Sequence, residues 1–259
     1  MRSPHAPVSR PPHPGLRGSV PRGYRGWTVR PPDRAGRFVL PASLSVQLVL
    51  KIEDSAVRPP EFVNGVQSTY AVIDGGCAPQ YVEVALSPLG AYRLLGLPMH
   101  RLRDQLVDMN DVLGREVARL GEMVRKQPTW SRRFAVLDRF LLDRLDTGPA
   151  VAREVEFAWD RLVATGGTLT IGGLQREIGW SHKHLIRRFT EQVGVTPKLA
   201  ARMMRFERVL GRMSREPRPD WARLAFETGY ADQAHLIRDF GEFAGTSPGR
   251  LPGPPRAAG

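Results

Sequence analysis

The sequence contains almost no cysteine, since Cys77 is the only one among 259 residues. A single cysteine excludes an internal disulfide and a zinc site built from several thiolates. Without a sign of a reactive environment, we expect Cys77 to be an ordinary thiol and not a redox sensor. The chain also has no uncharged apolar run of about 18 residues and no apolar signal-peptide core. These absences predict a protein of the cytoplasm without a membrane span.

Catalytic motifs are absent as well. The sequence lacks the phosphate-binding Gly-x-x-x-x-Gly-Lys-[Ser/Thr] motif, the Gly-x-Ser-x-Gly nucleophile motif and the His-Glu-x-x-His zinc motif. Between His13 and His182 the only histidine is His100, whereas a metal-binding barrel takes several histidines from its strands. We therefore expect no catalytic residue, no metal and no cofactor. An enzyme built on the strand-rich part of the chain is the weakest hypothesis.

The net charge of +12 is distributed unevenly along the chain. Residues 1–37 contain 8 Lys and Arg against 1 Asp or Glu, and residues 152–259 contain 17 against 12. The stretch between them is neutral, with 13 charges of each sign. A basic excess favours nucleic acid or another polyanion as a partner, although solvated basic surfaces are also common.

Proline and glycine divide the first half of the chain into segments. Residues 1–36 form a basic, proline-rich tract that is predicted to be a disordered tail, and residues 252–259 are predicted to be a second one. Apolar or alternating runs between residues 37 and 86 predict a small, mostly antiparallel sheet or partial barrel. These runs are residues 44–52, 62–63 before an Asn64-Gly65 turn, 68–73 and 81–86.

Helical periodicity follows the strands. Residues 89–95, an amphipathic stretch from 102 to 124 with a break expected near residues 108–111, and residues 134–145 are predicted helices. The sequence Asp-Thr-Gly-Pro at 146–149 is a break that marks the predicted domain boundary. From Ala150 onward nearly the whole chain has helical periodicity. The expected fold class is therefore α+β, with a sheet and helices before this boundary and an all-α region after it.

The most informative feature is an internal repeat. Residues 184–189 (HLIRRF) return 51 residues later as residues 235–240 (HLIRDF). The first copy is called unit one (residues 174–197) and the second unit two (residues 224–248). Each copy is typical of a helix, a tight glycine turn and a second helix. The matching flanks are residues 174–180 with 224–230, and Gly-Val-Thr-Pro at 194–197 with Gly-Thr-Ser-Pro at 245–248.

Glycine and a capping residue define the turn in each unit. Gly179 and Gly229 end the first helices, where a residue with positive φ turns the chain sharply and glycine carries no Cβ penalty. Ser181 and Asp232 are good N-caps for the second helices, which are expected at about residues 181–191 and 232–243. Apolar pairs at i and i+4 are expected to hold each second helix to its own unit, namely Leu185 with Phe189 and Leu236 with Phe240.

The opposite face of each second helix is predicted to be exposed. An α-helix fits the major groove of B-DNA, where arginine or lysine donates to guanine and glutamine pairs with adenine. Two such helices joined by a rigid helix predict a reader of successive grooves, about 34 Å apart. A helical bundle with a charged surface is the alternative that the repeat disfavours. The exposed residues are Lys183, Ile186 and Arg187 with Gln233, Ile237 and Arg238, flanked by His182, Arg188 and His235.

At these residues the chain resembles the AraC/XylS family of bacterial transcription regulators. The resemblance covers residues 152–251 and includes both units, the Gly-x-[Ser/Thr]-Pro after each, and the linking helix. Gln175 departs from the family pattern, because this first-helix position is usually small, as Ala225 is in unit two. By this resemblance the base-contacting residues are His182, Lys183, Ile186 and Arg187 in unit one, and Gln233, Ala234, His235 and Arg238 in unit two.

The main hypothesis is a sequence-specific regulator that binds double-stranded DNA through residues 150–251, with the nucleoid as its location. Residues 37–147 would then be a regulatory or dimerisation domain, as in one actinobacterial-type branch that this region is similar to. By the resemblance, RNA polymerase, a homodimer partner and a small-molecule effector are further candidate partners, and activation is the commoner mode. The alternative is a small-molecule-gated sensor or dimerisation protein whose intrinsic DNA binding is weak.

Overall fold

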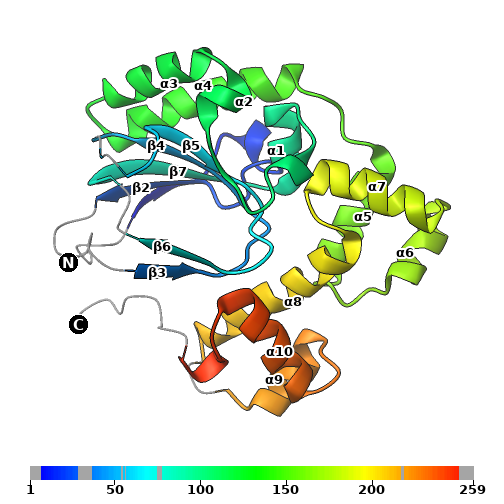
Figure 1. The fold of residues 1–259 in the computed structure, drawn as a ribbon. Coiled ribbons are helices and arrows are strands. Elements are labelled where there is room, and N and C mark those ends of the chain that lie inside the picture. The colour runs from blue at the N-terminus through cyan, green and yellow to red at the C-terminus, as the bar shows by residue number, and fades with distance from the viewer. Residues whose placement is uncertain are drawn as a thin grey trace.

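The fold combines an antiparallel sheet covered by helices with a helical C-terminal part, as a computed structural model shows (Figure 1). The structure describes residues 7–28, 37–53, 55, 57–74, 78–216 and 219–250. The α+β fold class predicted from the sequence is confirmed. Residues 1–6 and 29–36 of the predicted tail, the predicted tail at 252–259, and Cys77 lie outside the described residues.

The larger sheet has six strands in the order β1-β2-β7-β4-β5-β8, and every pair in it is antiparallel. A second sheet pairs β3 with β6 and lies below the larger one in Figure 1. Most residues of the central strands β4 and β7 are buried, on both faces of the sheet, and Leu48 and Val84 belong to the main hydrophobic core. The strands are β1 (Val8–Arg10), β2 (Tyr24–Thr28), β3 (Arg37–Leu40), β4 (Val46–Lys51), β5 (Glu61–Asn64), β6 (Ala71–Asp74), β7 (Gln80–Leu86) and β8 (Leu106–Asp108).

The prediction of a disordered tail is wrong for residues 7–28. This segment forms β1, a 3-10 turn (Pro14–Leu16) and β2, and β2 lies between β1 and β7 inside the sheet. Leu16, Val20 and Tyr24 are fully buried, so the few apolar residues among the prolines are the ones that attach the segment. Asp138 on the covering helix accepts a hydrogen bond from Tyr24 and pairs with Arg10. Composition alone missed these long-range partners.

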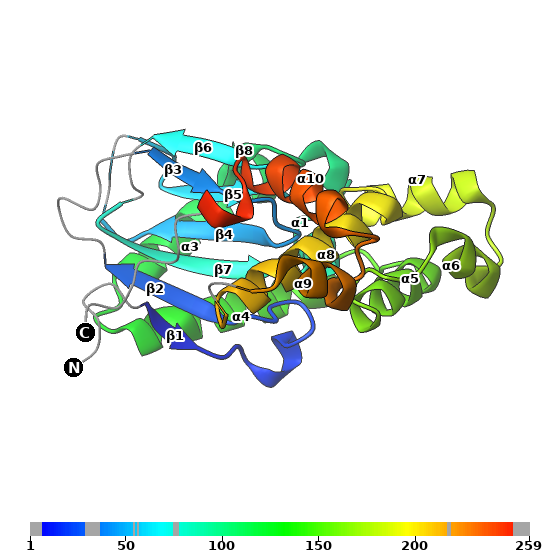
Figure 2. The same cartoon turned by 90° about the horizontal axis from the view of Figure 1, so that it is seen from below.

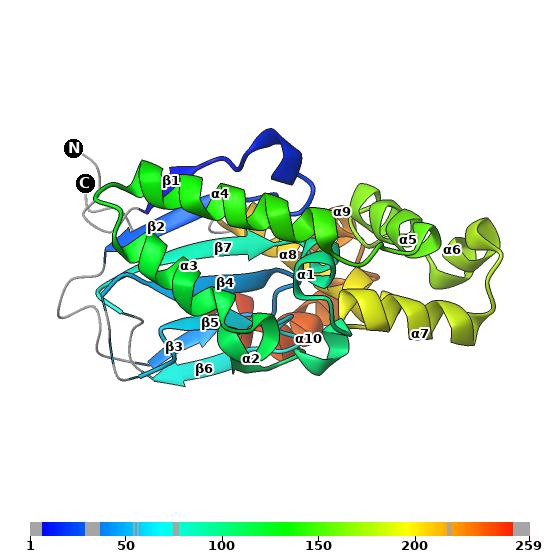
Figure 3. The same ribbon diagram turned by 90° about the horizontal axis from the view of Figure 1, so that it is seen from above.

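Helices cover one face of the larger sheet, as Figure 3 shows from above. They are α1 (Pro88–Leu95), α2 (Met109–Leu113), α3 (Glu116–Arg125) and α4 (Trp130–Thr147), with a 3-10 turn (Met99–Arg101) after α1. The amphipathic stretch predicted at 102–124 is not one helix, because its first part forms β8 at the sheet edge and Gly114 separates α2 from α3. The Asn64-Gly65 turn is not a hairpin, because β5 pairs with β4 and β8 and not with β6.

The C-terminal part begins after a short connection between Thr147 and Arg153. Its helices are α5 (Arg153–Ala164), α6 (Ile171–Ile178), α7 (His182–Val193), α8 (Pro197–Met213), α9 (Trp221–Thr228) and α10 (Gln233–Ala244), followed by a 3-10 turn (Pro248–Arg250). Pro197 occupies the first turn of α8, where its missing N–H is harmless, and Thr196 caps the helix. None of the helices in the described part of the chain is long and apolar enough to span a membrane.

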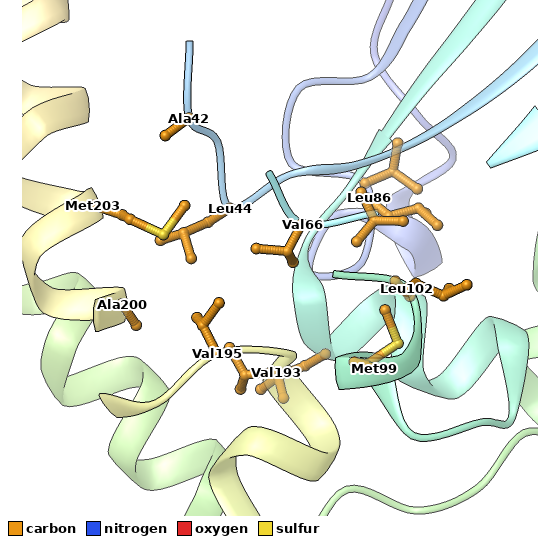
Figure 4. Close-up of a cluster of buried hydrophobic side chains, with 14 of the residues drawn as sticks. Ala42, Leu44, Val66, Leu86, Met99, Leu102, Val193, Val195, Ala200 and Met203 are labelled. Atoms are coloured by element: carbon orange, nitrogen blue, oxygen red, sulfur yellow. The ribbon is translucent and has the colours of Figure 1, made fainter. Parts of the chain in front are cut away.

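Both parts of the chain share one hydrophobic core. Figure 4 shows side chains from the sheet side, including Leu44, Val66 and Met99, packed against Val193 and Met203 of the helical part. Backbone hydrogen bonds extend the contact, since the Ala42 N–H donates to the Phe243 carbonyl at 2.8 Å. The Leu44 N–H also donates to the Glu207 carboxylate on α8 at 3.2 Å. The sheet therefore holds α7, α8 and α10 directly.

Candidate nucleic-acid interface

Unit one folds as the predicted helix, turn and helix. Helix α6 ends at Gly179, which has a φ of +76°, and α7 begins after Ser181. The Ser181 hydroxyl accepts a hydrogen bond from the His184 N–H at 3.3 Å, which satisfies one free donor at the start of α7. The turn lies at the end of the molecule farthest from the sheet (Figures 2 and 3). The start of α7 is therefore open to a large partner.

Unit two repeats this geometry. Helix α9 ends at Gly229, with a φ of +84°, and α10 begins after Asp232. The Asp232 carboxylate accepts a hydrogen bond from the His235 N–H at 2.7 Å, and Asp220 caps α9 in the same way. The left-handed glycines and the N-caps predicted from the sequence are confirmed in both units. Figure 2 shows α8 running from one unit to the other.

The predicted apolar anchors are buried. Leu185 and Phe189 of α7 are fully buried, and Leu236 and Phe240 of α10 are each 1% exposed. Burial of such pairs fixes how each helix is rotated against its unit, so the opposite face turns outward. Of the predicted site residues, Ile186, Arg188 and His235 are half-buried, and the rest are exposed: His182, Lys183, Arg187, Gln233, Ala234 and Arg238.

The cationic side chains on these helices differ in whether they have an ion-pair partner. Arg188 forms an ion pair with Glu191 at 2.8 Å on its own helix, so its charge is partly neutralised. Arg187 Nη2 lies 3.5 Å from Nδ1 of His184, and none of Arg187, Lys183 and Arg238 has an ion-pair partner among the described residues. Lys183, Arg187 and Arg238 are therefore the cations most available to a negatively charged partner.

The two histidines of the repeat have a structural role that the sequence did not suggest. The His184 ring meets the Trp180 ring edge to face, with centroids 4.4 Å apart, and His235 meets Tyr230 in the same way at 5.1 Å. These contacts brace the start of each helix against the residue that follows the turn glycine. Both histidines therefore help to fix the second helix of their unit.

A groove between the two units is the feature that sequence reasoning missed. It encloses about 790 Å³, and the long helix α8 forms its floor. Arg202 of α8 is bound there by Asp239 and Glu242, and these hydrogen bonds raise the pKa of its guanidinium. The other cations of the groove are Lys198, Arg205 and Arg238. No group of metal-ligating side chains occurs among the residues that the structure describes.

The comparisons with known proteins agree with this geometry. Residues 174–252 match a family model described as a helix-turn-helix domain. A stretch of 68 residues is 37% identical to an "Uncharacterized HTH-type transcriptional regulator YbfI" of Bacillus subtilis (strain 168). That stretch covers 26% of this chain and about a quarter (24%) of the relative's length.

Two solved structures are similar over most of the chain, at low identity. Crystalline ToxT from Vibrio cholerae O395 matches with a TM-score of 0.46 and 10% identity, over 87% of this chain and 94% of ToxT. Wild-type ToxT from Vibrio cholerae strain SCE256, solved with an unsaturated fatty acid bound, matches with a TM-score of 0.41 and 14% identity, over 87% and 92%. The assignment to a family therefore depends on the repeated units and on the match to the helix-turn-helix family model. Residues 174–252 are thus an AraC-type helix-turn-helix domain.

Proposed function

We propose that the protein is a sequence-specific, double-stranded DNA-binding transcription regulator whose helices α7 and α10 enter successive major grooves. The observation that carries this proposal is the duplicated unit. In both copies a capped helix is anchored by a buried Leu-Phe pair and exposes polar side chains in its first turns. A helix presented in this way fits the major groove with its N-terminal half toward the base edges.

The side chains divide into two roles in this proposal. Arg187 and Arg238 are exposed, and a guanidinium group can donate two parallel hydrogen bonds, which suits guanine or an adjacent phosphate. Lys183 and Gln233 lie one turn earlier and are the next candidates. The remaining predicted contacts are His182, Ile186, Arg188, Ala234 and His235.

The groove between the units is a place where the DNA backbone could lie. When two helices occupy successive major grooves, the backbone that crosses between them faces the protein surface that joins the units. Here that surface carries exposed Lys198 on α8. A cation at this place would position the duplex without reading its sequence.

Selection of duplexes from a random DNA library, using the full chain at near-physiological salt, tests the proposal. We expect enrichment of two short boxes about one helical turn, or roughly 34 Å, apart. Arg187→Ala is expected to weaken binding by about 1–3 kcal/mol and to relax sequence preference in one box, whereas Arg238→Ala relaxes the other.

Arg139→Ala is the matched control, because Arg139 is exposed on α4, away from both units. Its operator affinity is expected to equal that of the wild type. Binding without any enriched sequence would contradict sequence-specific recognition. A uniform loss over all sequences in Arg187→Ala would make this side chain a phosphate contact.

We assign residues 150–251 to DNA binding and the sheet-containing part before them to regulation. In this assignment the protein works in the cytoplasm on nucleoid DNA, with RNA polymerase and a second copy of the chain as further partners. Measuring mass in solution with and without operator DNA tests the dimer, since a monomer that binds both boxes would exclude it.

A small-molecule gate is the second candidate function, and one groove favours it. This groove encloses about 580 Å³ between the sheet side, including Arg22 and Leu44, and helices α5 and α8, including Val163 and Arg208. A molecule bound there would contact both parts of the chain and stabilise the form that binds it. Glu207 in the same groove lies 3.5 Å from Arg22, so a small organic acid would pair mainly with Arg208. A panel of such acids is expected to raise Tm in the wild type but not in Val163→Trp, and no Tm shift with any acid would contradict this candidate.

A further inference from the structure

Arg202 on helix α8 forms ion pairs with α10, the second of the two helices proposed to contact DNA. Arg202 Nη2 donates to Asp239 Oδ1 at 2.8 Å, and Nη1 donates to Glu242 Oε1 at 3.1 Å. The guanidinium also lies over the Phe243 ring, with 5.0 Å to its centroid. One side chain therefore contacts three residues on successive turns of α10, which opposes both rotation and sliding of that helix along α8.

The environment of the contact makes it strong. The Asp239 side chain is only 5% exposed, and that of Arg202 is 25% exposed. Charges in such surroundings are screened little by solvent, and a buried carboxylate that loses its partner destabilises the fold. The geometry of α10 against α8 is therefore coupled to this ion pair more tightly than to an exposed one.

Unit one has no ion pair equivalent to the one between Arg202 and Asp239 among the described residues. The repeat aligns Arg188 with Asp239 and Glu191 with Glu242, so the charge at the first of these positions is reversed between the units. Arg188 pairs with Glu191 on its own helix and does not reach α8. The ion pair is thus specific to unit two and does not follow from the shared helix-turn-helix pattern.

A second arginine on α8 contacts the loop that precedes unit one. Arg205 lies three residues after Arg202, and its Nη1 donates to the Gly167 carbonyl in the loop before α6 at 2.6 Å. Its guanidinium lies 5.4 Å from the centroid of the Tyr230 ring in unit two. Arg205 therefore joins the loop before α6 to unit two, one turn of α8 beyond the contact that Arg202 makes with α10.

We propose that Arg202 is a positioning residue that sets which spacing between two DNA boxes the protein accepts, with Arg205 holding the other side. This role rests on the proposed function. DNA boxes move by about 3.4 Å and rotate by roughly 34° for each base pair inserted between them. A protein with a rigid α8–α10 contact must reject such insertions, whereas a loose contact tolerates them.

The test measures binding of the full chain to the selected operator and to operators with one base pair added or removed between the boxes. For the wild type we expect the altered spacings to bind at least about tenfold more weakly. For Arg202→Met the ratio is expected to fall to about threefold or less, mainly because the correct spacing binds more weakly. Arg202→Lys keeps the positive charge but loses the paired donors of the guanidinium group. Its ratio is expected to lie between those of the wild type and Arg202→Met.

Two further variants test the ion pair from its other side and control for the loss of an unrelated ion pair. Asp239→Asn preserves side-chain shape and is expected to reduce the spacing ratio even if Arg202→Met folds poorly. Arg161→Met is the matched control, because Arg161 pairs with Glu177 at 2.8 Å between α5 and α6, outside the α8–α10 contact. Its spacing ratio is expected to equal that of the wild type.

Several results would overturn the role of Arg202. An unchanged ratio accompanied by a lower Tm would make the ion pair a contributor to stability only. Equal losses at every spacing, with a salt dependence reduced by about one phosphate contact, would make Arg202 a direct DNA contact. A wild-type chain without any spacing preference would overturn the proposed bipartite binding itself, and this role with it.

Discussion

The two turn glycines offer a matched pair for testing how each unit is built. Gly179 and Gly229 have nearly the same backbone conformation, with φ of +76° and +84°. Their surroundings differ, because a Cβ at 179 would meet nothing within 4 Å, whereas a Cβ at 229 would lie 2.4 Å from Thr168 Cγ2. Replacing each glycine by alanine therefore applies the same backbone strain, but only unit two also receives a steric clash.

The magnitudes follow from these two contributions. Alanine in the left-handed region costs about 1–2 kcal/mol, which is the whole expected loss in unfolding free energy for Gly179→Ala. Overpacking adds about 1–3 kcal/mol, so Gly229→Ala is expected to lose roughly 2–5 kcal/mol. Thr168 cannot rotate away freely, because its hydroxyl donates to the Thr165 carbonyl at 2.9 Å.

Urea unfolding followed by circular dichroism measures both losses through the transition midpoint, provided that the m-value stays constant. Thr168→Ser removes the methyl group that clashes and keeps the hydroxyl. The double variant Gly229→Ala with Thr168→Ser is therefore expected to recover to the loss seen for Gly179→Ala, after correction for Thr168→Ser alone. Equal losses for the two glycine variants, or no recovery in the double variant, would refute this reasoning.

Two other predictions concern a helix cap and a buried phenol. Asp232→Ala removes the carboxylate that caps α10, and we expect a loss of about 1 kcal/mol in urea unfolding, with Asp143→Ala on the exposed face of α4 as the neutral control. Burial and the hydrogen bond to Asp138 raise the pKa of Tyr24 above its ordinary value of 10.0. The folded state then keeps a proton that the unfolded state releases, so stability is complete below about pH 10 and falls as pH rises further. Tm measured from neutral pH to above this value is expected to fall more steeply in the wild type than in Tyr24→Phe, and parallel curves would exclude this cause.

The repeated units were predictable because their determinants are local. A turn glycine, a capping side chain two or three residues later and an apolar pair at i and i+4 each act within one or two helical turns. Gly179, Ser181 and the Leu185–Phe189 pair all have the conformation and burial that their spacing indicates. The exposure of Lys183 and Arg187 follows from that anchoring, and their contact with DNA stays a prediction.

The ordering of residues 7–28 was not predictable from composition. Prolines and arginines dominate this segment, and only a few apolar residues among them, Leu16, Val20 and Tyr24, are fully buried. Their partners are remote, since Tyr24 lies between β1 and β7 and its hydroxyl bonds to Asp138 at 2.6 Å. The Asp138 carboxylate also forms an ion pair with Arg10. The arginine therefore has a partner within the fold, whereas the composition of the segment predicted that its charge would be solvated.

The sequence by itself determined the α+β division, the two helix-turn-helix units and the polar face of each second helix, because these depend on periodicity and short-range contacts. Only the tertiary structure decided that β2 enters the sheet, that both parts share one core, and that Arg202 joins α8 to Asp239 on α10. Each of these depends on residues brought together across dozens of positions. Such contacts are selected by the packing of the whole chain, and no local pattern in the sequence records them.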